Sequence, residues 1–340
     1  MYSVGVLNVG VFGASGFGGA ELLRLLAGHP QMDLKLATAD TQAGGRVADL
    51  YPSLAAAYPD TFFANADPEA ADGLDLVFLA LPHGASQGLV PKLRQRAGVV
   101  VDLAADFRLK DPALYPAWYG EDHQHPELLA EAVFGLPELF RADLPGATLV
   151  AAAGCYVTAA SLALAPLVRH GVVEARGVIV DAASGVSGAG RVPKANTHFN
   201  TVDEDFTAYG LLRHRHTPEM EQATGASILF TPHLAPMNRG ILATCYARAT
   251  DGRDPLEVLA DAYRGEPFIV VSDRPPSTKA ALGSNSAHLT ARVDRRTGWV
   301  ITMCALDNLT KGAAGQAIQC ANAALGLPET AGLPVVGVYP

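Results

Sequence analysis

Charged residues are scarce in this chain of 340 residues. Asp, Glu, Lys and Arg make up 17% of it and hydrophobic residues 49%, a balance that is typical of a compact globular protein and excludes a largely disordered one. The formal net charge of -9 argues against nucleic acid or an anionic membrane surface as a partner. Small anionic substrates stay compatible with it, because local arginines can form a basic pocket in an acidic protein.

Cysteine is also rare, and the four residues Cys155, Cys245, Cys304 and Cys320 form no C-x-x-C pair and no zinc-type spacing. The sequence has no long apolar run, no signal peptide and no internal repeat. We therefore expect a cytoplasmic protein with reduced thiols, no membrane partner and no metal site. The length is sufficient for two domains with cores of their own.

The N-terminal segment has the order strand, glycine turn, helix. An apolar, valine-rich run at 4–12 predicts a buried parallel strand, G-A-S-G-F-G-G follows at 13–19, and closely spaced leucines then give a helical face. In this context glycines bind a dinucleotide: Gly13 permits the turn, Gly16 lets the pyrophosphate approach, and Gly19 lets the helix pack close to the sheet. The spacing is G-x-x-G-x-x-G and not the standard G-x-G-x-x-G, so a turn without a ligand is the alternative.

Further apolar runs predict parallel strands at 34–38, 74–81, 99–103 and 149–153. Loops after the carboxyl ends of such strands line the crevice of a doubly wound sheet, which makes His83, Asp106 and Arg108 candidate pocket residues.

Cofactor preference is open on local chemistry. Asp40 follows the second strand at the position where an acid binds the ribose of NAD, whereas Thr41, Gln42 and Gly44 could equally accept the 2′-phosphate of NADP.

Cys155 follows the last of these strands and precedes a helix-like run at 158–168, which Pro166 interrupts. At a helix N-terminus the free N–H groups and the backbone dipole favour the thiolate, which is the nucleophilic form. A buried structural cysteine is the plainer interpretation. The position at a strand end beside the predicted crevice favours the nucleophile.

The pattern changes beyond Cys155. Runs at 178–182, 227–231, 241–248, 287–293 and 299–305 predict a second, largely antiparallel sheet, with a helix at 255–263. A glycine-rich loop is expected at 184–191, and a long helix is expected to begin near Lys311 and end by Gly326. Asn308 and Gly312, at the start of that helix, are placed where they could meet the nicotinamide end of a dinucleotide.

Two histidines precede a further predicted helix. Thr217 is its expected N-cap and Pro218 its first residue, so His214 and His216 lie in extended chain with their side chains on one face. A catalytic or substrate-binding role is favoured. A metal site lacks an evident third ligand, and a solvated basic loop is the remaining alternative.

Taken in order, these motifs resemble those of the N-acetyl-gamma-glutamyl-phosphate reductases, which are related to the aspartate-semialdehyde dehydrogenases. The resemblance runs nearly end to end and includes F-L-A-L-P-H-G, A-D-F-R-L-K-D, G-C-Y-V-T-A, S-G-V-S-G-A-G-R, H-R-H-T-P-E-M and L-D-N-L-T-K-G-A-A-G-Q-A. It implies an α/β fold: a Rossmann-type doubly wound parallel sheet at 1–154, completed by 310–340, and an α+β catalytic and dimerisation domain with a mostly antiparallel sheet at 155–309. A homodimer or homotetramer is expected.

The same resemblance implies NADPH-dependent reduction of an acyl phosphate to an aldehyde in arginine biosynthesis, with NAD not excluded because of Asp40. Cys155 resembles the nucleophile, His216 the acid/base, and His214 a neighbouring contributor. The implied substrate-binding residues are Arg108, Arg191, Lys194 and His198. The implied cofactor-binding residues are Gly13, Ser15, Gly16, Phe17, Gly18, Thr38, Ser184, Gly188 and Asn308. Ala152, Ala153 and Val157 stand where the family usually has Asn, Pro and Pro.

Three alternative functions remain at this stage. The first is the same chemistry on another acyl phosphate, such as aspartyl phosphate or a carrier-linked aminoadipyl or glutamyl phosphate. The second is a non-catalytic NADP-binding sensor, for which the cysteine would be dispensable. The third is a protein in which the cysteine and histidines are purely structural.

Overall fold

The computed structural model describes residues 5–340, which divide into two compact units. The first unit comprises the chain up to Pro112, residues 122–153 and residues 313–333; the second comprises residues 113–121, 154–312 and 334–340. This division differs from the boundaries expected from the sequence, because segments 113–121 and 334–340 group with the second unit. Residues 1–4, which begin the predicted first strand and first domain, lie outside the described residues.

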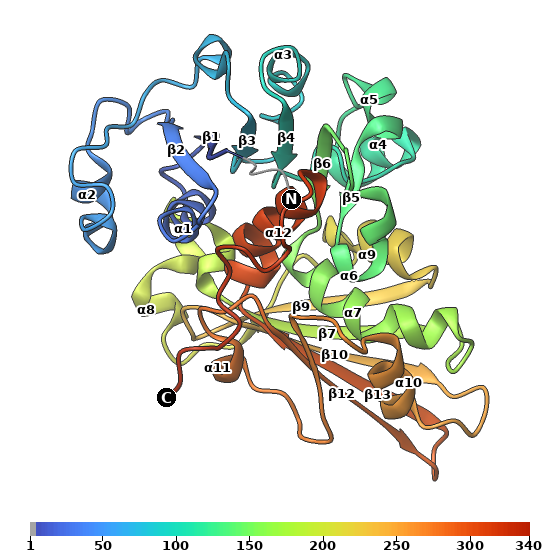
Figure 1. Ribbon diagram of the computed structural model, residues 1–340. Helices are drawn as coiled ribbons and strands as arrows, with labels where there is room; N and C mark the ends of the chain where they lie inside the picture. The colour runs from blue at the N-terminus through green and yellow to red at the C-terminus, as the bar shows by residue number, and fades with distance from the viewer. Residues whose placement is uncertain (1–4) are drawn as a thin grey trace. The chain divides into compact units, whose positions relative to one another are not determined.

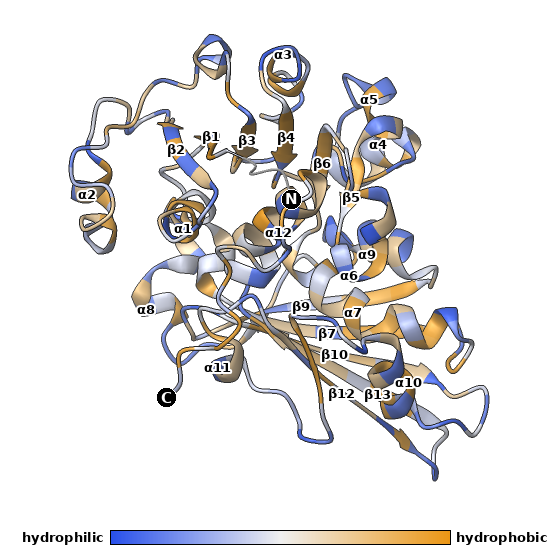
Figure 2. Ribbon diagram, viewed as in Figure 1, coloured by the Kyte–Doolittle hydropathy of each residue, from blue (hydrophilic) through white to orange (hydrophobic). Residues whose placement is uncertain are grey.

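A six-stranded, all-parallel sheet forms the centre of the first unit (Figure 1). Its order is β2-β1-β3-β4-β6-β5, from β1 (Leu7–Phe12), β2 (Met32–Ala37), β3 (Leu76–Leu79), β4 (Val99–Asp102), β5 (Val133–Gly135) and β6 (Leu149–Ala152). All residues of β3, β4 and β6 are buried, as expected for strands covered on both faces. Figure 2 shows β3 and β4 as almost uniformly hydrophobic.

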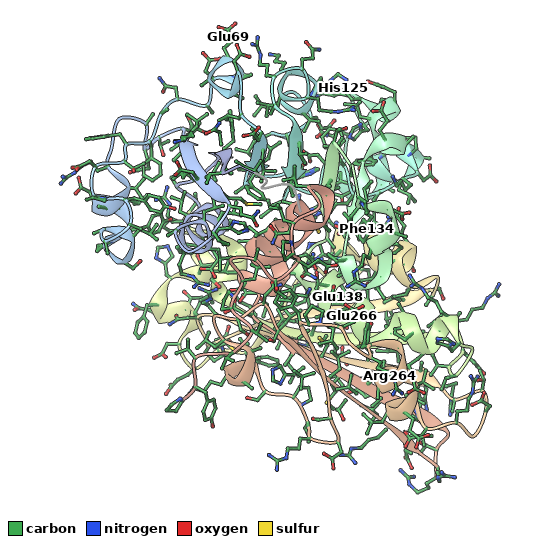
Figure 3. All side chains as sticks on the ribbon, in the orientation of Figure 1. Glu69, His125, Phe134, Glu138, Arg264 and Glu266 are labelled. Carbon is green, nitrogen blue, oxygen red and sulfur yellow. The ribbon has the colours of Figure 1, made fainter. Side chains whose placement is uncertain are left out.

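The first unit contains the helices α1 (Phe17–Leu26), α2 (Val47–Leu50), α3 (Val90–Leu93), α5 (Pro126–Glu131), α6 (Pro137–Phe140) and α12 (Gly315–Ala324). Helix α12 packs against β4, β5 and β6, and its small residues Ala317 and Ala321 are fully buried there. Its Gln319 also donates a hydrogen bond of 2.9 Å to Glu138 of α6, which is labelled in Figure 3. The C-terminal helix is therefore an integral layer of the parallel-sheet unit.

A seven-stranded mixed sheet forms the second unit, in the order β11-β12-β13-β10-β7-β9-β8. Its strands are β7 (Val178–Gly185), β8 (Thr207–Ala208), β9 (Ile228–Ala235), β10 (Ile241–Arg248), β11 (Ile269–Val271), β12 (Ala287–Asp294) and β13 (Trp299–Leu306). The pairs β11/β12 and β7/β9 are parallel, and the other four neighbouring pairs are antiparallel. The predicted fold class, a parallel Rossmann-type sheet plus a mostly antiparallel second sheet, is confirmed.

The second unit contains the helices α4 (Tyr115–Tyr119), α7 (Cys155–Arg169), α8 (Phe199–Val202), α9 (His216–Thr224), α10 (Pro255–Ala262) and α11 (Thr278–Ala281). Helix α7 packs against β10 and β13, and α10 packs against α7 and β12.

Short 3-10 helices occur in both units, at Pro52–Leu54, Pro68–Ala71, Pro112–Leu114, Arg141–Asp143, Val186–Ala189 and Ala195–Thr197. No helix within residues 5–340 has the length and apolar character needed to cross a membrane.

Helix α7 is longer than predicted and is not broken by Pro166. A proline in a helix cannot donate to the carbonyl four residues earlier, which here belongs to Leu162. The hydroxyl of Tyr263, just beyond α10, donates to that carbonyl oxygen at 2.7 Å. The lost backbone bond is thus replaced by a side chain that is distant in sequence, and the helix runs on to Arg169.

Two other helix starts differ from the prediction: at the first the predicted boundary is wrong, and at the second the helix begins near Lys311 as predicted but its first turn is not α-helical. Helix α9 begins at His216 after Arg215, which has helical dihedral angles, so Thr217 is not the N-cap and the two histidines are not in extended chain. The segment Thr310–Ala314 is a π-helical turn that precedes α12. Both differences affect residues close to the nucleophile candidate.

Candidate active site

Cys155 is the first residue of the fifteen-residue helix α7, and Gly154 is the N-cap. The buried strand β6 ends at Ala152, so the chain passes from strand to helix across only two residues. Cys155 is partly exposed, whereas Cys245, Cys304 and Cys320 are buried. At such a position the backbone dipole of a helix favours the thiolate form of a cysteine.

A cavity of about 420 Å³ opens onto Cys155, and all of its lining residues belong to the second unit. Of the residues singled out from the sequence it brings together the thiol, both histidines, one lysine and two loop residues: Cys155, His214, His216, Lys194, Ser184 and Gly188. The other lining residues are Tyr156, Ala189, Asn196, Tyr209, Gly210, Arg213, Arg215 and Leu234.

The charges around this cavity are of one sign. Lys194, Arg213 and Arg215 line it, and no Asp or Glu is among the described lining residues. Within residues 5–340 none of these three cations forms an ion pair with a carboxylate, and Arg215 instead lies over the ring of Tyr119 at 5.9 Å. In a chain of net charge -9, such a cavity is suited to a substrate with more than one negative charge.

The two histidines differ in their environment. The backbone N–H of His216 donates to Nδ1 of His214 at 3.2 Å, and the two rings lie 4.7 Å apart. Burial, with a further contribution from the neighbouring His216, lowers the pKa of His214 to about 3. His214 is therefore neutral at physiological pH and acts as an acceptor that fixes the start of α9, which leaves His216 as the better candidate for proton transfer.

Two tyrosines and a glutamate, which no sequence motif marks as functional, complete the site. The hydroxyls of Tyr156 and Tyr209 lie 3.1 Å apart, and burial raises the pKa of both, that of Tyr209 to about 12. Glu219 is fully buried in the first turn of α9, and its Oε2 accepts a hydrogen bond of 3.3 Å from the N–H of Gly154. It thereby ties α9 to the N-cap of α7.

Several predicted residues do not line this cavity. Arg191 is half-buried, and His198 is an exposed N-cap of α8. The side chain of Asn308 accepts from the N–H of Gly240 at 2.7 Å and donates to Ser187 Oγ at 3.0 Å. Arg108 belongs to the first unit, where it is largely buried and donates to the carbonyl of Leu103 at 2.6 Å. Their predicted roles stay predictions.

The glycine turn of the first unit has the geometry that a dinucleotide requires. Gly13 has φ of +82°, and a Cβ there would lie 2.5 Å from the carbonyl oxygen of Ala80; a Cβ at Gly19 would lie 2.4 Å from that of Gly13. Gly16 is the N-cap of α1, so Phe17 and Gly18 present free N–H groups. Thr38 is buried, and its Oγ1 accepts from the N–H of Gly13 at 3.4 Å.

The loops after β3 and β4 are joined by buried carboxylates. Asp106 accepts from the N–H groups of Gly84 and Ser86 and from Ser86 Oγ, and it pairs with His83 Nδ1 at 2.5 Å. Burial opposes its ionisation, but these partners outweigh burial and hold the pKa of Asp106 at about 2. Burial, reinforced by the charge of Asp106, raises the pKa of Asp102 to about 7.

No group of three or more His, Cys, Asp or Glu side chains within residues 5–340 is arranged to hold a metal ion. Ala153 uses its N–H to donate to the carbonyl of Gly135 at 3.1 Å. Val157 is fully buried in the first turn of α7.

Both halves of the chain match one class of enzyme, the semialdehyde dehydrogenases. Residues 8–147 match the semialdehyde dehydrogenase NAD binding domain, and residues 155–308 match the semialdehyde dehydrogenase dimerisation domain. The fold agrees: aspartate semialdehyde dehydrogenase II of Vibrio cholerae, in complex with ASA, superposes with a TM-score of 0.70 at 17% identity over 94% of this chain and 98% of that one. Aspartate semialdehyde dehydrogenase of Candida albicans, with NADP, superposes with a TM-score of 0.69 at 15% sequence identity, over 94% of this chain and 98% of that one.

Sequence relatives narrow the class. The chain is 50% identical to an N-acetyl-gamma-glutamyl-phosphate reductase of Salinispora arenicola over 98% of its own length and 99% of the relative. It is 46% identical to an N-acetyl-gamma-glutamyl-phosphate reductase of Symbiobacterium thermophilum, over 98% of its own length and 99% of the relative. The chain belongs to the N-acetyl-gamma-glutamyl-phosphate reductase family, a group of oxidoreductases of arginine biosynthesis with an NAD(P)-binding Rossmann domain.

Proposed function

We propose that this protein reduces N-acetyl-gamma-glutamyl phosphate to N-acetylglutamate 5-semialdehyde and phosphate, with NADPH as hydride donor and Cys155 as nucleophile. The observation that carries the proposal is a helix-N-terminal thiol in a cavity with three cations and no acid among its described lining residues. A substrate with one phosphate and one carboxylate matches that charge. The particular substrate is proposed from the sequence similarity to N-acetyl-gamma-glutamyl-phosphate reductases, which extends over nearly the whole chain.

The chemistry follows from the residues that line the cavity. The thiolate of Cys155 attacks the γ-carbonyl carbon, a C–S bond forms, the C–O bond to phosphate breaks, and phosphate leaves with the bonding electron pair. Reduction of the resulting thioester requires a hydride, which NADPH would supply when bound. His216 donates a proton to the former carbonyl oxygen, and loss of that proton with cleavage of the C–S bond then releases the aldehyde and the thiolate. Lys194, Arg213 and Arg215 offset the negative charge that builds on the phosphate.

NADPH is proposed over NADH from the family resemblance and from the side chains that follow β2. Thr41 and Arg46 are exposed donors there, which suits a 2′-phosphate, although Arg46 also pairs with Asp49 at 2.9 Å. Asp40, also exposed, favours the ribose hydroxyl of NAD. Ser15, Gly16, Phe17, Gly18, Thr38, Ser184, Gly188 and Asn308 are proposed as cofactor contacts, and Arg108, Arg191 and His198 as further substrate contacts.

The test is the reverse reaction, phosphate-dependent oxidation of an aldehyde. We expect N-acetylglutamate 5-semialdehyde with NADP to give the highest kcat/KM among four combinations of that aldehyde or aspartate semialdehyde with NADP or NAD. Faster oxidation of aspartate semialdehyde would contradict the substrate, and faster reaction with NAD would contradict the cofactor. Binding of NADPH without turnover of either aldehyde would indicate a sensor and not an enzyme.

We also propose self-association through the face of the second sheet that α7 and α10 leave open. Most of the half-buried residues on this face of its central strands have large side chains with apolar surface, with exposed Leu229 beside them; Asp181 and Thr244 are the polar residues among them. The large ones are Ile179, Leu242, Tyr246, Ile301 and Met303. A match to a dimerisation domain over residues 155–308 supports a homo-oligomer. A homodimer, or a homotetramer made from it, is the proposed assembly.

A further inference from the structure

The π-helical turn at Thr310–Ala314 lies directly against the nucleophile candidate. In this turn the N–H of Gly312 donates a hydrogen bond of 2.9 Å to the carbonyl oxygen of Asp307, five residues earlier, which is the π-helical pattern. A Cβ at Gly312 would lie 2.8 Å from Cβ of Cys155 and 3.3 Å from its Cα. The turn therefore forms one wall behind Cys155, and any displacement of it shifts the space that the thiol occupies. π-Helical turns concentrate at functional sites.

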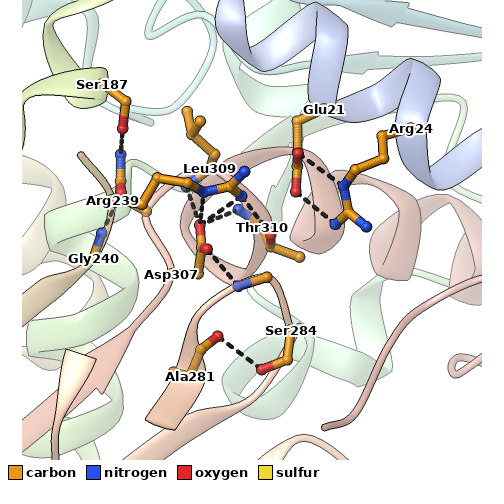
Figure 4. Close-up of polar contacts among 12 residues, drawn as sticks. Glu21, Arg24, Ser187, Arg239, Gly240, Ala281, Ser284, Asp307, Leu309 and Thr310 are labelled. Atoms are coloured by element: carbon orange, nitrogen blue, oxygen red, sulfur yellow. Dashed lines mark hydrogen bonds and ion pairs between the residues drawn. The ribbon is translucent and has the colours of Figure 1, made fainter. Parts of the chain in front are cut away.

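The carboxylate of Asp307 holds this turn from within (Figure 4). The residue is fully buried, and its Oδ1 accepts from the N–H of Leu309 at 2.9 Å and that of Thr310 at 3.0 Å. The same oxygen accepts from Nη2 of Arg239 at 2.9 Å, and this guanidinium also donates to Thr310 Oγ1 at 3.0 Å. The other oxygen, Oδ2, accepts from the N–H of Gly283 at 2.7 Å.

The residue after Asp307 extends the same cluster to the glycine-rich loop. Asn308 accepts from the N–H of Gly240, the neighbour of Arg239, and donates to Ser187 in the 3-10 helix Val186–Ala189. A Cβ at Gly188 would lie 2.9 Å from Ser184 Oγ, so the loop packs closely against the end of β7 at this point. Ser184 and Gly188 both line the cavity at Cys155.

We propose that Asp307, through its ion pair with Arg239, is a positioning residue for the reaction: it fixes the π-helical turn behind Cys155 and the glycine-rich loop across the cavity. It touches no reacting atom and acts through Gly312 on one side and Asn308 on the other. This inference rests on the proposed function in so far as Cys155 is the nucleophile. The loss of position that follows from breaking such a cluster lowers kcat more than it raises KM.

The test compares Asp307→Asn with Asp294→Asn. Asp294 is the matched control, since it also accepts hydrogen bonds in a turn of the same sheet, at the opposite end of β13. For Asp307→Asn we expect kcat to fall on the order of ten- to a hundredfold with KM for the aldehyde little changed. We also expect iodoacetamide to alkylate Cys155 more slowly in the free enzyme. The alkylation rate reports on this residue alone, because the other three cysteines are buried.

A second pair of variants keeps the test decisive if Asp307→Asn does not fold. Arg239 is partly exposed, so Arg239→Gln removes the ion-pair partner at lower risk, and Arg239→Lys retains the cation. We expect Arg239→Gln to reproduce the loss of kcat and of alkylation, and Arg239→Lys to restore part of both. Gly312→Ala, which acts on Cys155 directly, should show the same slower alkylation.

The two proposals fail separately. Alkylation and kcat that are equal in Asp307→Asn, Arg239→Gln and the control would overturn the positioning role and leave the reductase function intact. Turnover that persists in Cys155→Ser would overturn the covalent route, whereas the alkylation rates of the Asp307 and Arg239 variants would still report on the turn.

Discussion

The first prediction concerns the thiol of Cys155. Replacement by serine keeps the size of the side chain and the N-terminal position on α7, but a hydroxyl at this site is not ionised at neutral pH. We expect Cys155→Ser to lower kcat by at least about 10³-fold. Binding of NADPH, measured by fluorescence titration, should be unchanged, and Cys304→Ser in the buried core is the control for replacing a cysteine. Near-normal turnover would contradict the covalent mechanism.

The second prediction concerns Arg213, a lining residue without a carboxylate partner in the described chain. Leu212, the residue before it, has φ of +60°, a left-handed conformation that is costly for leucine and typical of functional sites. Arg213→Gln should raise one KM in the phosphate-dependent assay by about tenfold, the effect of losing one charge-assisted contact. An increase in KM for phosphate places Arg213 at the phosphate, and an increase in KM for the aldehyde places it at the carboxylate.

Arg296→Gln, in the exposed turn between β12 and β13, is the matched control for that loss of charge. Both KM values unchanged in Arg213→Gln would show that the arginine has no part in substrate binding.

Some functional residues have a clear sequence signature and others have none. The glycines and Cys155 are identifiable because strand, glycine and helix follow one another along the chain. Arg213 and Arg215 are indistinguishable from a solvated basic loop, since only the fold turns them toward a thiol distant in sequence. Glu219 matches an ordinary first-turn acid, and its bond to Gly154 depends on how α9 meets α7.

At the scale of elements, prediction succeeds where burial alone decides the structure. Strand β10 (Ile241–Arg248) has the predicted bounds, and β6 and β13 differ from the prediction by a single residue at one end. The buried faces of these strands require apolar residues, and those residues are visible in the sequence. The errors occur where a distant side chain determines the backbone. Tyr263 sustains α7 through Pro166, and Asp307 holds the π-helical turn that was predicted as ordinary helix. The short strands β5, β8 and β11 are set by their neighbours and carry no pattern of their own.

The third prediction concerns the carboxylate pair that joins the loops after β3 and β4. Asp102 has a pKa of about 7 in the fold and near 3.8 when unfolded, so between pH 4 and 7 the folded state retains a proton that the unfolded chain has released. The contribution of Asp102 to stability is therefore full at low pH and falls as pH rises, by up to about 1.4 kcal/mol per pH unit. Asp106 has a lowered pKa of about 2, so its contribution to stability has the opposite sign of pH dependence: it is full above pH 4 and is lost as the pH falls towards 2.

Asp102→Asn should remove this pH dependence, because an amide has nearly the size of the acid, its oxygen can accept from Ser86 Oγ as Asp102 Oδ2 does at 2.7 Å, and it cannot ionise. We expect the variant to gain stability relative to the wild type from pH 5 to pH 8, measured by thermal unfolding at each pH. Asp33→Asn, at an exposed position on β2, is the control. A difference between variant and wild type that does not vary with pH would contradict the raised pKa of Asp102.

The molecule as a whole separates two tasks between its units. The parallel sheet with α1 and α12 supplies the glycine turn for a dinucleotide, and the mixed sheet with α7 and α9 supplies the thiol, the histidines and the cations. The helices cover one face of the mixed sheet, and the half-buried apolar side chains on the other face call for a partner surface. The match to a dimerisation domain favours a second copy of the same chain as that partner.

The last prediction tests that assembly on the central strand of the open face. Leu242 lies on the central strand β10, between Ala183 on β7 and Ala305 on β13, so Leu242→Lys would place a charge inside the interface wherever two such faces meet. We expect light scattering to give the wild type at least the mass of a dimer, and the variant a dissociation constant raised by at least about 10²-fold. Leu211→Lys, in an exposed turn outside the strands of this sheet, should leave the mass unchanged. A monomeric wild type, or equal masses for both variants, would show that the open face is not the interface.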